Sequence, residues 1–345
     1  MSKTFTEILE KISNHEHLPA DEASAAMRLI LHGEISNEEI AAFLMGMRMK
    51  GETVIELTSF VKEMREAAVP VEVDTTNAVD LCGTGGDKSG TFNISTTAMF
   101  IVAGAGVPVL KHGNRSVSSK SGSYDVLESL GVVPNLQKEQ VEELFNKTGM
   151  AFMFAPNFHP AMKHVMPARR SLKMRTFFNI LGPLVNPANV NCQVIGAFNK
   201  ETAQKMIQIL GNLQTENAYT VNAHDGLDEV STTSQSEIFE LKTYLSGDSV
   251  TFDPISLGYE KTDHKSLLGG DAKKNAEIML SILDGTSTRA QRDIVELNAT
   301  FAIRASNITD DLNEAKEMAA ESIDSGKARK KLGQFIKESQ TIADQ

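Results

Sequence analysis

Four glycines follow a short apolar run and precede a helical pattern, in the stretch GTGGDKSGT at residues 83–91. Glycines let backbone N–H groups come close to a ligand, and the start of the following helix offers its positive end. The arrangement suits a phosphate or a pyrophosphate. It matches neither the nucleotide P-loop, which ends in Gly-Lys-Ser/Thr, nor the Rossmann fingerprint. A tight turn with helix caps is the alternative, and four glycines with several hydroxyls disfavour it.

A second polar segment, KHGNRSVSSKSGS at residues 111–123, follows the next apolar run. It carries Lys111, Arg115 and Lys120, many hydroxyls and no acid. Taken alone, such a loop is most simply a solvated surface. Open α/β sheets, however, bind ligands at the carboxyl ends of their strands, and the glycine-rich loop is expected at the same edge. We therefore interpret this segment as a second anion site.

Two adjacent carboxylates, Asp228 and Glu229, lie in the turn DGLDE at residues 225–229, after the apolar run 218–222. Together with phosphate oxygens they suit Mg²⁺, a hard cation that needs few protein ligands. On its own, an acidic turn is usually only a turn. The case for a metal therefore depends on the two anion loops.

A cluster of arginines, Arg169, Arg170 and Arg175, precedes the stretch LGPLVNP. A planar guanidinium grips a carboxylate in two places, so this cluster is a candidate carboxylate site. The alternative is a solvated helix face.

The histidines give a weaker signal. His112 suits either an acid–base group or a hydrogen-bonding wall beside a glycine turn. His159 and His164 lie five positions apart, which does not place them on one helix face for a metal ion. No Ser-His-Asp or Cys-His arrangement is evident from spacing.

The elements that position these residues fall into two classes. The first 70 residues predict packed helices, with capping boxes at Ser36–Glu39 and Thr53–Glu56 and a helix between Pro19 and Gly33. From about Val73, strands and helices alternate, which predicts a mostly parallel sheet. The expected strands are 79–82, 107–110, 151–154, 192–198 and 218–222, with a few short ones within 236–252. A helix is expected from residue 94 onward, and further helices at 124–130, 138–147 and 200–213 and in the tail from 271. The stretch 159–184 is helix-like and contains several prolines.

Charge and composition exclude several classes. The chain has 345 residues and a formal charge of −11, which opposes a general nucleic-acid binder. No apolar run approaches the roughly 20 residues of a membrane helix. The first residues lack a signal-peptide stretch, so we expect a cytoplasmic protein. A disulfide between Cys82 and Cys192 is not expected there.

Taken together, the segments GTGGD, NISTT, KHGNRSVSSKSGS, RTFFNILGPLVNPA and DGLDEVS resemble the anthranilate phosphoribosyltransferase family of tryptophan biosynthesis. The resemblance runs from the N-terminal helices to the C-terminal tail, and its motifs are long and ordered. It implies transfer of the 5-phosphoribosyl group of phosphoribosyl pyrophosphate to the amine of anthranilate, with Mg²⁺. The products would be N-(5-phosphoribosyl)anthranilate and pyrophosphate, the second step from chorismate to tryptophan.

The same resemblance implies an α/β protein in which a small all-helical lobe is hinged to a large α/β lobe with a mostly parallel central sheet. The helical lobe would comprise residues 1–70 plus about 166–187, form a homodimer and serve the anthranilate side. The large lobe would comprise residues 73–165 plus 188–345 and bind phosphoribosyl pyrophosphate. Neither nucleic acid nor membrane is an expected partner.

The family's site is carried over position by position. Positions that match the phosphoribosyl pyrophosphate site are Gly83, Gly86, Asp87, Thr91, Asn93, Ile94, Ser95, Thr96, Lys111, His112, Gly113, Asn114, Arg115, Ser116, Val117, Ser118, Ser119 and Ser123. Positions that match anthranilate contacts are Gly83, Asn114 and Arg169, and those that match Mg²⁺ ligands are Ser95, Asp228 and Glu229.

The chemistry of this transfer predicts which groups matter. Ribosyl transfer passes through a state with oxocarbenium character, so the main demand is stabilisation of the departing pyrophosphate. Lys111, backbone amides and Mg²⁺ would supply it. The aromatic amine is neutral at pH 7, so positioning is expected to dominate and no residue is assigned as general acid or base. Closure of the helical lobe would bring Arg169 to the site.

Two residues depart from the family's pattern. Tyr124 and Lys173 stand where the family commonly has a small residue and glycine, which affects the packing of the second loop and the anthranilate entrance.

A pyrimidine nucleoside phosphorylase-like enzyme shares the architecture and also acts at a ribosyl C1, but with free phosphate. A non-enzymatic nucleic-acid-binding relative of the same fold is the other alternative, and the acidic charge opposes it.

Overall fold

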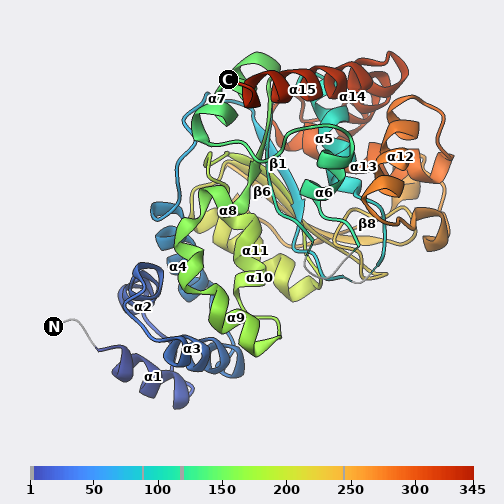
Figure 1. Cartoon of the computed structure of the whole chain (residues 1–345). Helices are drawn as coiled ribbons and strands as arrows, with labels where there is room; N and C mark the ends of the chain where they lie inside the picture. The colour runs from blue at the N-terminus through green and yellow to red at the C-terminus, as the bar shows by residue number, and fades with distance from the viewer. Residues whose placement is uncertain (1–3, 88, 117–119, 244) are drawn as a thin grey trace.

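The computed structural model describes residues 4–87, 89–116, 120–243 and 245–345. A small group of N-terminal helices lies beside a larger layered part built on one sheet (Figure 1). The N-terminal helices are α1 (Phe5–Ser13), α2 (Ala20–His32), α3 (Asn37–Lys50) and α4 (Val54–Glu66). The predicted capping boxes precede α3 and α4, and the left-handed Gly33 ends α2. The helical start of the chain is therefore confirmed.

One sheet forms the centre of the larger part. Its strands are β1 (Val79–Gly83), β2 (Val109–Gly113), β3 (Met150–Phe154), β4 (Cys192–Gly196), β5 (Asn217–Ala223), β6 (Ser236–Lys242), β7 (Leu245–Ser246) and β8 (Val250–Phe252). The order is β3-β2-β1-β4-β5-β6-β7, with β8 also paired to β6. β1 to β5 are parallel, and only β6 to β8 join antiparallel. The predicted mostly parallel sheet is confirmed.

Helices cover both faces of this sheet (Figure 1). α5 (Ile94–Gly104) and α13 (Arg289–Ala305) pack on β1 from one face, with α14 (Leu312–Asp324) and α15 (Lys327–Ala343) outside them. α11 (Lys200–Asn212) packs on β5 and β6 and touches α4, so it joins the sheet to the N-terminal helices. The remaining elements lie around these layers: α6 (Ser123–Ser129), α7 (Lys138–Thr148), α12 (Ala272–Leu283), and the 3-10 turns η3 (Pro254–Leu257) and η4 (His264–Leu267).

The chain returns to the N-terminal helices between β3 and β4. This return contains α8 (Ala155–Phe158), η1 (Pro160–His164), α9 (Met166–Leu172), α10 (Phe178–Leu181) and η2 (Gly182–Leu184). Phe177 packs against Phe60 of α4, with ring centroids 4.8 Å apart, and Val165 and Ala168 lie in the same core. The predicted helical lobe would need such a return, although its exact division at 166–187 stays a prediction.

The strand order creates one place where a ligand fits best. From β1 the chain proceeds to β2 and β3 on one side, whereas from β4 it proceeds to β5 on the other. The connections therefore leave the carboxyl ends of β1 and β4 in opposite directions. Open α/β sheets bind ligands in the crevice at such a point.

Candidate active site

The acidic turn reaches the carboxyl ends of β1 and β4 because both strands end in glycine. Gly83 and Gly196 are ladder partners. A Cβ added at Gly83 would lie 2.3 Å from Asp228 Oδ2, and one at Gly196 would lie 1.5 Å from the Asp228 carbonyl oxygen. Side chains at either position would push the turn away. Gly196 was not predicted as a site residue, because the expected strand ran on to Phe198 and hid the glycine inside it, whereas β4 ends at Gly196.

The first loop and the acidic turn are in contact. The backbone N–H of Gly85 donates to Asp228 Oδ2 over 2.6 Å, and that of Ser95 donates to Glu229 Oε1 over 3.2 Å. Burial, then the charge of Asp87, raises the pKa of Asp228 to about 7. Burial, then the charge of Asp228, raises the pKa of Glu229 to about 8. Three carboxyl groups therefore crowd one edge of the sheet, and their negative charges repel one another.

Lys111 brings a cation to this acidic edge. It is the middle residue of β2, and it is only 2% exposed. The ammonium donates to the carbonyl oxygen of Leu81 and lies 3.4 Å from Ser95 Oγ. Its positive charge lowers the pKa of Glu229, against the stronger effect of burial. The charge of Lys111 is thus directed at the place where the two loops and the acidic turn meet.

The carboxylates at this edge fit a cation that shares its ligands with a substrate. Among the described residues, no group of three or more His, Cys, Asp and Glu side chains forms a metal site by itself. Mg²⁺ commonly keeps several waters and takes one or two carboxylates plus substrate phosphate oxygens. Asp228 and Glu229, whose pKa values are raised by burial and by neighbouring carboxylates, suit that role, and Ser95 adjoins them.

The glycine-rich loop is held from outside by residues distant in the sequence. The guanidinium of Arg175 donates to the carbonyl oxygen of Gly86 and lies 4.7 Å from the ring centroid of Phe198. His264 Nε2 lies 2.8 Å from the carbonyl oxygen of Ser89. Thr91 forms a bridge with the residue after η4. No local pattern indicates that these partners hold the loop, because their contacts depend on tertiary structure.

The start of α5 places the remaining residues of the first motif. The amide of Asn93 bonds to the carbonyl oxygen of Ser121 over 3.2 Å and accepts from Asn275 of α12 over 2.9 Å. Ile94 and Thr96 are buried. Ile94 lies in the main hydrophobic core, so its side chain packs inward. Ligand contacts by these three residues stay predictions.

The second loop is anchored by the helix that follows it. Arg115 pairs with Asp125 over 3.0 Å and Glu128 over 3.2 Å, and its guanidinium lies 3.7 Å from the ring centroid of Tyr124. That ring packs on Phe154 at 4.4 Å. The loop's own sequence has no acid, but α6 supplies two, so Arg115 is largely neutralised. Tyr124 therefore helps to hold this loop in place, through its contacts with Arg115 and Phe154.

Other residues of the second loop form a compact turn. Ser123 Oγ donates to the carbonyl oxygen of Asn114, and the Ser116 N–H donates to Asp125. A Cβ at Gly113 would lie 2.3 Å from Ser123 Oγ. Asn114 is exposed. The predicted ligand residues Val117, Ser118 and Ser119 lie outside the described residues.

Two histidines meet beside the end of β2. The ring centroids of His112 and His159 lie 5.1 Å apart, and neither Nε2 atom has a hydrogen-bond partner in the described part of the chain. Burial lowers the pKa of His112 to about 3 and that of His159 to about 4. Both rings are therefore neutral at pH 7. Spacing alone had offered no role for His159, because its partner is distant in the sequence.

Arg169 lies on α9, half-buried, with its guanidinium 5.3 Å from the ring centroid of Phe178. Burial lowers the pKa of Arg169, and no carboxylate of the described ranges is among the groups that shift this pKa. A half-buried guanidinium without an anion is consistent with a carboxylate site, not with a solvated helix face. Lys173 ends α9 with a φ of +50°, a left-handed conformation that glycine adopts most easily.

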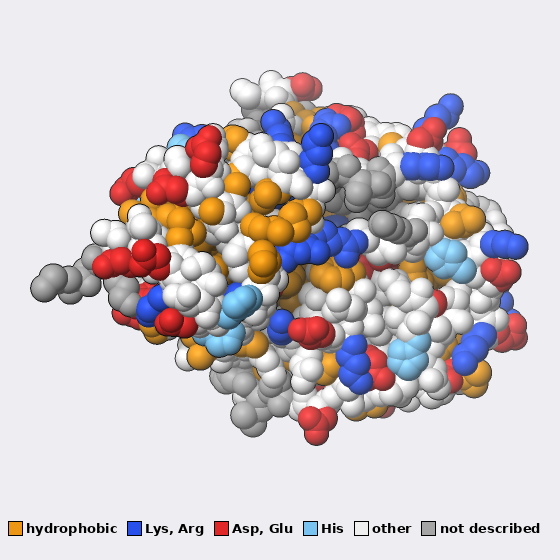
Figure 2. Space-filling view, turned by 90° about the horizontal axis from the view of Figure 1, so that it is seen from below, with side chains coloured by type: hydrophobic (Ala, Val, Ile, Leu, Met, Phe, Trp, Pro, Cys, Tyr) orange, Lys and Arg blue, Asp and Glu red, His pale blue; other side chains and the backbone are white. Residues whose placement is uncertain are grey.

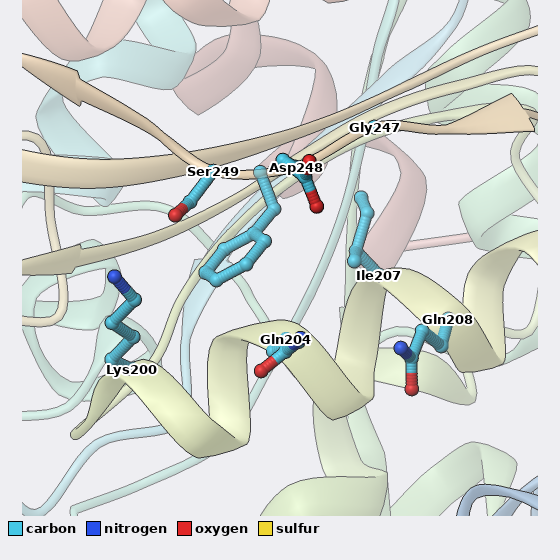
Figure 3. Close-up of a pocket in the computed structure, with 8 residues that line it drawn as sticks. Lys200, Gln204, Ile207, Gln208, Gly247, Asp248 and Ser249 are labelled. Carbon is cyan, nitrogen blue, oxygen red and sulfur yellow. The ribbon is translucent and has the colours of Figure 1, made fainter.

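A hollow of about 540 Å³ lies elsewhere, between α11 and the segment before β8 (Figure 3). Lys200, Gln204 and Gln208 line it from the helix, and Asp248 and Ser249 from the other side. It contains none of the residues predicted to bind substrate, so the site is not there. Separately, no helix in the described ranges has the length and apolar character needed to cross a bilayer.

Comparisons with known proteins agree with this geometry. Residues 6–68 match the helical bundle domain of the glycosyl transferase family, and residues 75–329 match its a/b domain. The anthranilate phosphoribosyltransferase of Salinibacter ruber is 49% identical, over 93% of this chain and 94% of its own. That of Alkaliphilus metalliredigens is 47% identical, over 97% and 98%.

Solved structures give the same result. The anthranilate phosphoribosyltransferase of Thermus thermophilus superposes with a TM-score of 0.90 at 34% identity, covering 96% of this chain and 99% of its own. The Saccharomyces cerevisiae enzyme in complex with phosphoribosyl pyrophosphate and Mg superposes with a TM-score of 0.88 at 25% identity, covering 98% of each. Near-complete coverage at these identities leaves one assignment: the chain belongs to the anthranilate phosphoribosyltransferase family.

Proposed function

We propose that this protein transfers the 5-phosphoribosyl group of phosphoribosyl pyrophosphate to the amine of anthranilate, the second step from chorismate to tryptophan. The observation that carries the proposal is the meeting of the glycine-rich loop, Lys111 and the Asp228–Glu229 turn at the ends of β1 and β4. A buried lysine beside amide donors and carboxylates suits a pyrophosphate accompanied by a cation.

The reaction breaks the bond between C1 of the ribosyl ring and the pyrophosphate oxygen, and the electron pair leaves with pyrophosphate. The anthranilate nitrogen donates its lone pair to C1 and loses a proton to solvent. Charge develops on the leaving pyrophosphate, so the backbone amides of the loop and the Lys111 ammonium stabilise the transition state. The neutral aromatic amine needs no strong base, so holding the two substrates in line supplies most of the rate.

The metal proposal assigns Asp228, Glu229 and Ser95 to Mg²⁺. When bound, Mg²⁺ would neutralise charge on the pyrophosphate. The chain's own residues fit this role because the crowded carboxyl groups lack a cation besides Lys111 in the described site. A yeast relative has been solved with phosphoribosyl pyrophosphate and Mg, which supports the proposal for this chain.

The anthranilate proposal assigns Arg169 and Asn114 to the second substrate, with Gly83 between the two ligands. Arg169 would hold the carboxylate in two places. His112 and His159 form a neutral wall beside the end of β2, with two free Nε2 atoms that suit a polar aromatic ligand. A variant of the yeast enzyme has been solved with 4-fluoroanthranilate, which supports a site of this kind.

Two wider assignments complete the proposal. The helical lobe, residues 1–70 plus about 166–187, would close on the large lobe and form the homodimer, whereas residues 73–165 plus 188–345 would bind phosphoribosyl pyrophosphate. The cytoplasmic location expected from the sequence stays a prediction.

One assay tests the function. The protein is mixed with Mg²⁺, phosphoribosyl pyrophosphate and anthranilate, and the loss of anthranilate fluorescence is followed. We expect turnover that the double variant Asp228→Asn with Glu229→Gln loses while it keeps its fold by circular dichroism. Release of base from a pyrimidine nucleoside with free phosphate, without anthranilate consumption, would instead support the phosphorylase. Retarded migration of nucleic acid without either turnover would support the binding module.

A further inference from the structure

The ladder between β1 and β2 is incomplete. β1 pairs with β4 along its whole length, from Val79 with Cys192 to Gly83 with Gly196, and β2 pairs with β3 in the same way. Between β1 and β2, however, only Val79 and Val109 are ladder partners. The two strands run side by side, so the backbone groups beyond this point need other partners.

Three side chains supply those partners. Asp80 Oδ1 accepts from the His112 N–H over 3.3 Å, and the Lys111 ammonium donates to the Leu81 carbonyl oxygen. Asn186 Nδ2 donates to Asp80 Oδ2 and to the Leu110 carbonyl oxygen, each over 2.8 Å. The two strands are therefore linked here through side chains, with Lys111 among them.

These side chains are completely enclosed. Asp80 and Asn186 are 0% exposed, and Lys111 is 2% exposed. An isolated buried charge is costly, whereas a carboxylate near an ammonium and supplied with hydrogen bonds is tolerated. The Lys111 charge lowers the pKa of Asp80, although burial raises that pKa to about 6. The charge of the same lysine also lowers the pKa of Glu229.

We propose that Asp80 and Asn186 are positioning residues for Lys111: they link β2 to β1 on either side of the lysine and direct the ammonium to the leaving pyrophosphate. Asn186 donates a hydrogen bond to the Asp80 carboxylate. That carboxylate in turn accepts a hydrogen bond from the backbone N–H of His112, the residue next to Lys111. The inference rests on the proposed function, because pyrophosphate is the group that Lys111 meets there. It explains why Asp80 and Asn186 are both fully buried beside the strand that carries Lys111.

A double-mutant cycle tests the pair. Affinity for phosphoribosyl pyrophosphate with Mg²⁺ is measured by titration calorimetry in four forms: wild type, Asp80→Asn, Lys111→Met and both together. We expect Asp80→Asn to weaken binding ten- to a hundredfold, about the value of a charge-assisted contact. In the Lys111→Met background the same change should alter affinity less than threefold, because the residue it positions is gone. Equal losses in both backgrounds, or near-wild-type affinity of Asp80→Asn, would overturn the proposal.

Two further variants separate positioning from folding. Asn186→Ala removes the bonds to Asp80 and Leu110 without adding a donor, and it replaces Asp80→Asn in the cycle if that variant does not fold. Thr220 of β5 lies on a different strand from Lys111, and Thr220→Val removes its buried side-chain bond to the Ala203 carbonyl oxygen of α11. It should lower the melting temperature and leave affinity and kcat unchanged.

Turnover by the wild type is measured in the same preparations. A wild type that binds phosphoribosyl pyrophosphate but consumes no anthranilate would contradict the proposed function, while the cycle would still report on Lys111. Wild-type turnover combined with additive losses in the cycle would contradict the positioning role alone.

Discussion

The surroundings of Asp228 show how single residues control a charged site. The missing side chains of Gly83 and Gly196 leave room for this carboxyl group, and the Gly85 amide bonds it. The two glycines on β1 and β4 therefore determine where the Asp228 carboxyl group lies. The roles of Arg169 and His159 likewise depend on the groups that each side chain contacts.

Arg169→Ala should separate the two substrates kinetically. Loss of a charge-assisted contact costs about 1.5–3 kcal/mol, so KM for anthranilate should rise ten- to a hundredfold. KM for phosphoribosyl pyrophosphate should change only a few-fold, because α9 lies outside both phosphate loops. Steady-state kinetics with each substrate varied in turn gives the answer. Unchanged constants would indicate a structural residue, and a joint rise would indicate lobe closure.

His159 should make the protein less stable in acid. Its pKa is about 4 when folded, against an ordinary value of 6.5, so the unfolded chain takes up a proton first as pH falls. Stability from this group is therefore complete above pH 6.5 and is lost toward pH 4. From pH 7 to pH 5 the free energy of unfolding should fall about 2 kcal/mol further in wild type than in His159→Gln.

Urea unfolding at both pH values measures this difference. An identical pH dependence in wild type and His159→Gln would contradict the buried neutral state of His159.

At the scale of elements, the glycine-rich loop depends on segments that clamp it. Arg175, from the return between β3 and β4, holds Gly86, and η4 holds Ser89 and Thr91. Arg48 of α3 donates to the Arg175 carbonyl oxygen, so a helix of the N-terminal group adjoins the same contact. The loop is thus connected to the N-terminal helices through one arginine.

Gly86→Val should weaken binding of phosphoribosyl pyrophosphate at least tenfold, or about 1.4 kcal/mol. The position has a φ of +75°, and a Cβ there would lie 2.7 Å from Arg175 Nη2. Calorimetry measures the affinity. Gly106→Val is the matched control, with a φ of +94° and open space around it. It should lower stability alone. Unchanged affinity of Gly86→Val would show that the loop is only a turn.

At the scale of the whole molecule, the N-terminal helices present apolar side chains to solvent. Met45 and Met49 of α3 and Ile55 of α4 are 39%, 66% and 58% exposed. Figure 2 shows hydrophobic side chains gathering over the end of the molecule that these helices form. Exposed patches of this kind commonly mark interfaces, which supports the predicted homodimer.

Sedimentation should therefore give about twice the 37.6 kDa mass of the chain. The double change Met45→Glu with Met49→Glu should shift the protein to monomers, because charges would be buried at the interface. Ile255→Glu, at an exposed position on η3, is the control and should leave the mass unchanged. A wild-type monomer at micromolar concentration would contradict the prediction.

The sequence by itself determined much of the architecture and the family. Capping boxes, apolar periodicity and the alternation of strands with helices depend on neighbours a few positions apart, so they are legible without coordinates. The same holds for the GTGGD loop and the DGLDE turn, whose chemistry follows from residue types. Their meeting at one sheet edge was predictable, because parallel strands share a carboxyl end.

Only the tertiary structure decided which distant residues complete the site. Gly196 faces Asp228, Arg175 holds Gly86, and His159 meets His112 through contacts that no local pattern encodes. These pairings depend on the strand order and on the return of the chain to the N-terminal helices. The same packing buries Asp80 beside Lys111, since the ladder between β1 and β2 stops after one pair and leaves backbone groups for side chains to satisfy.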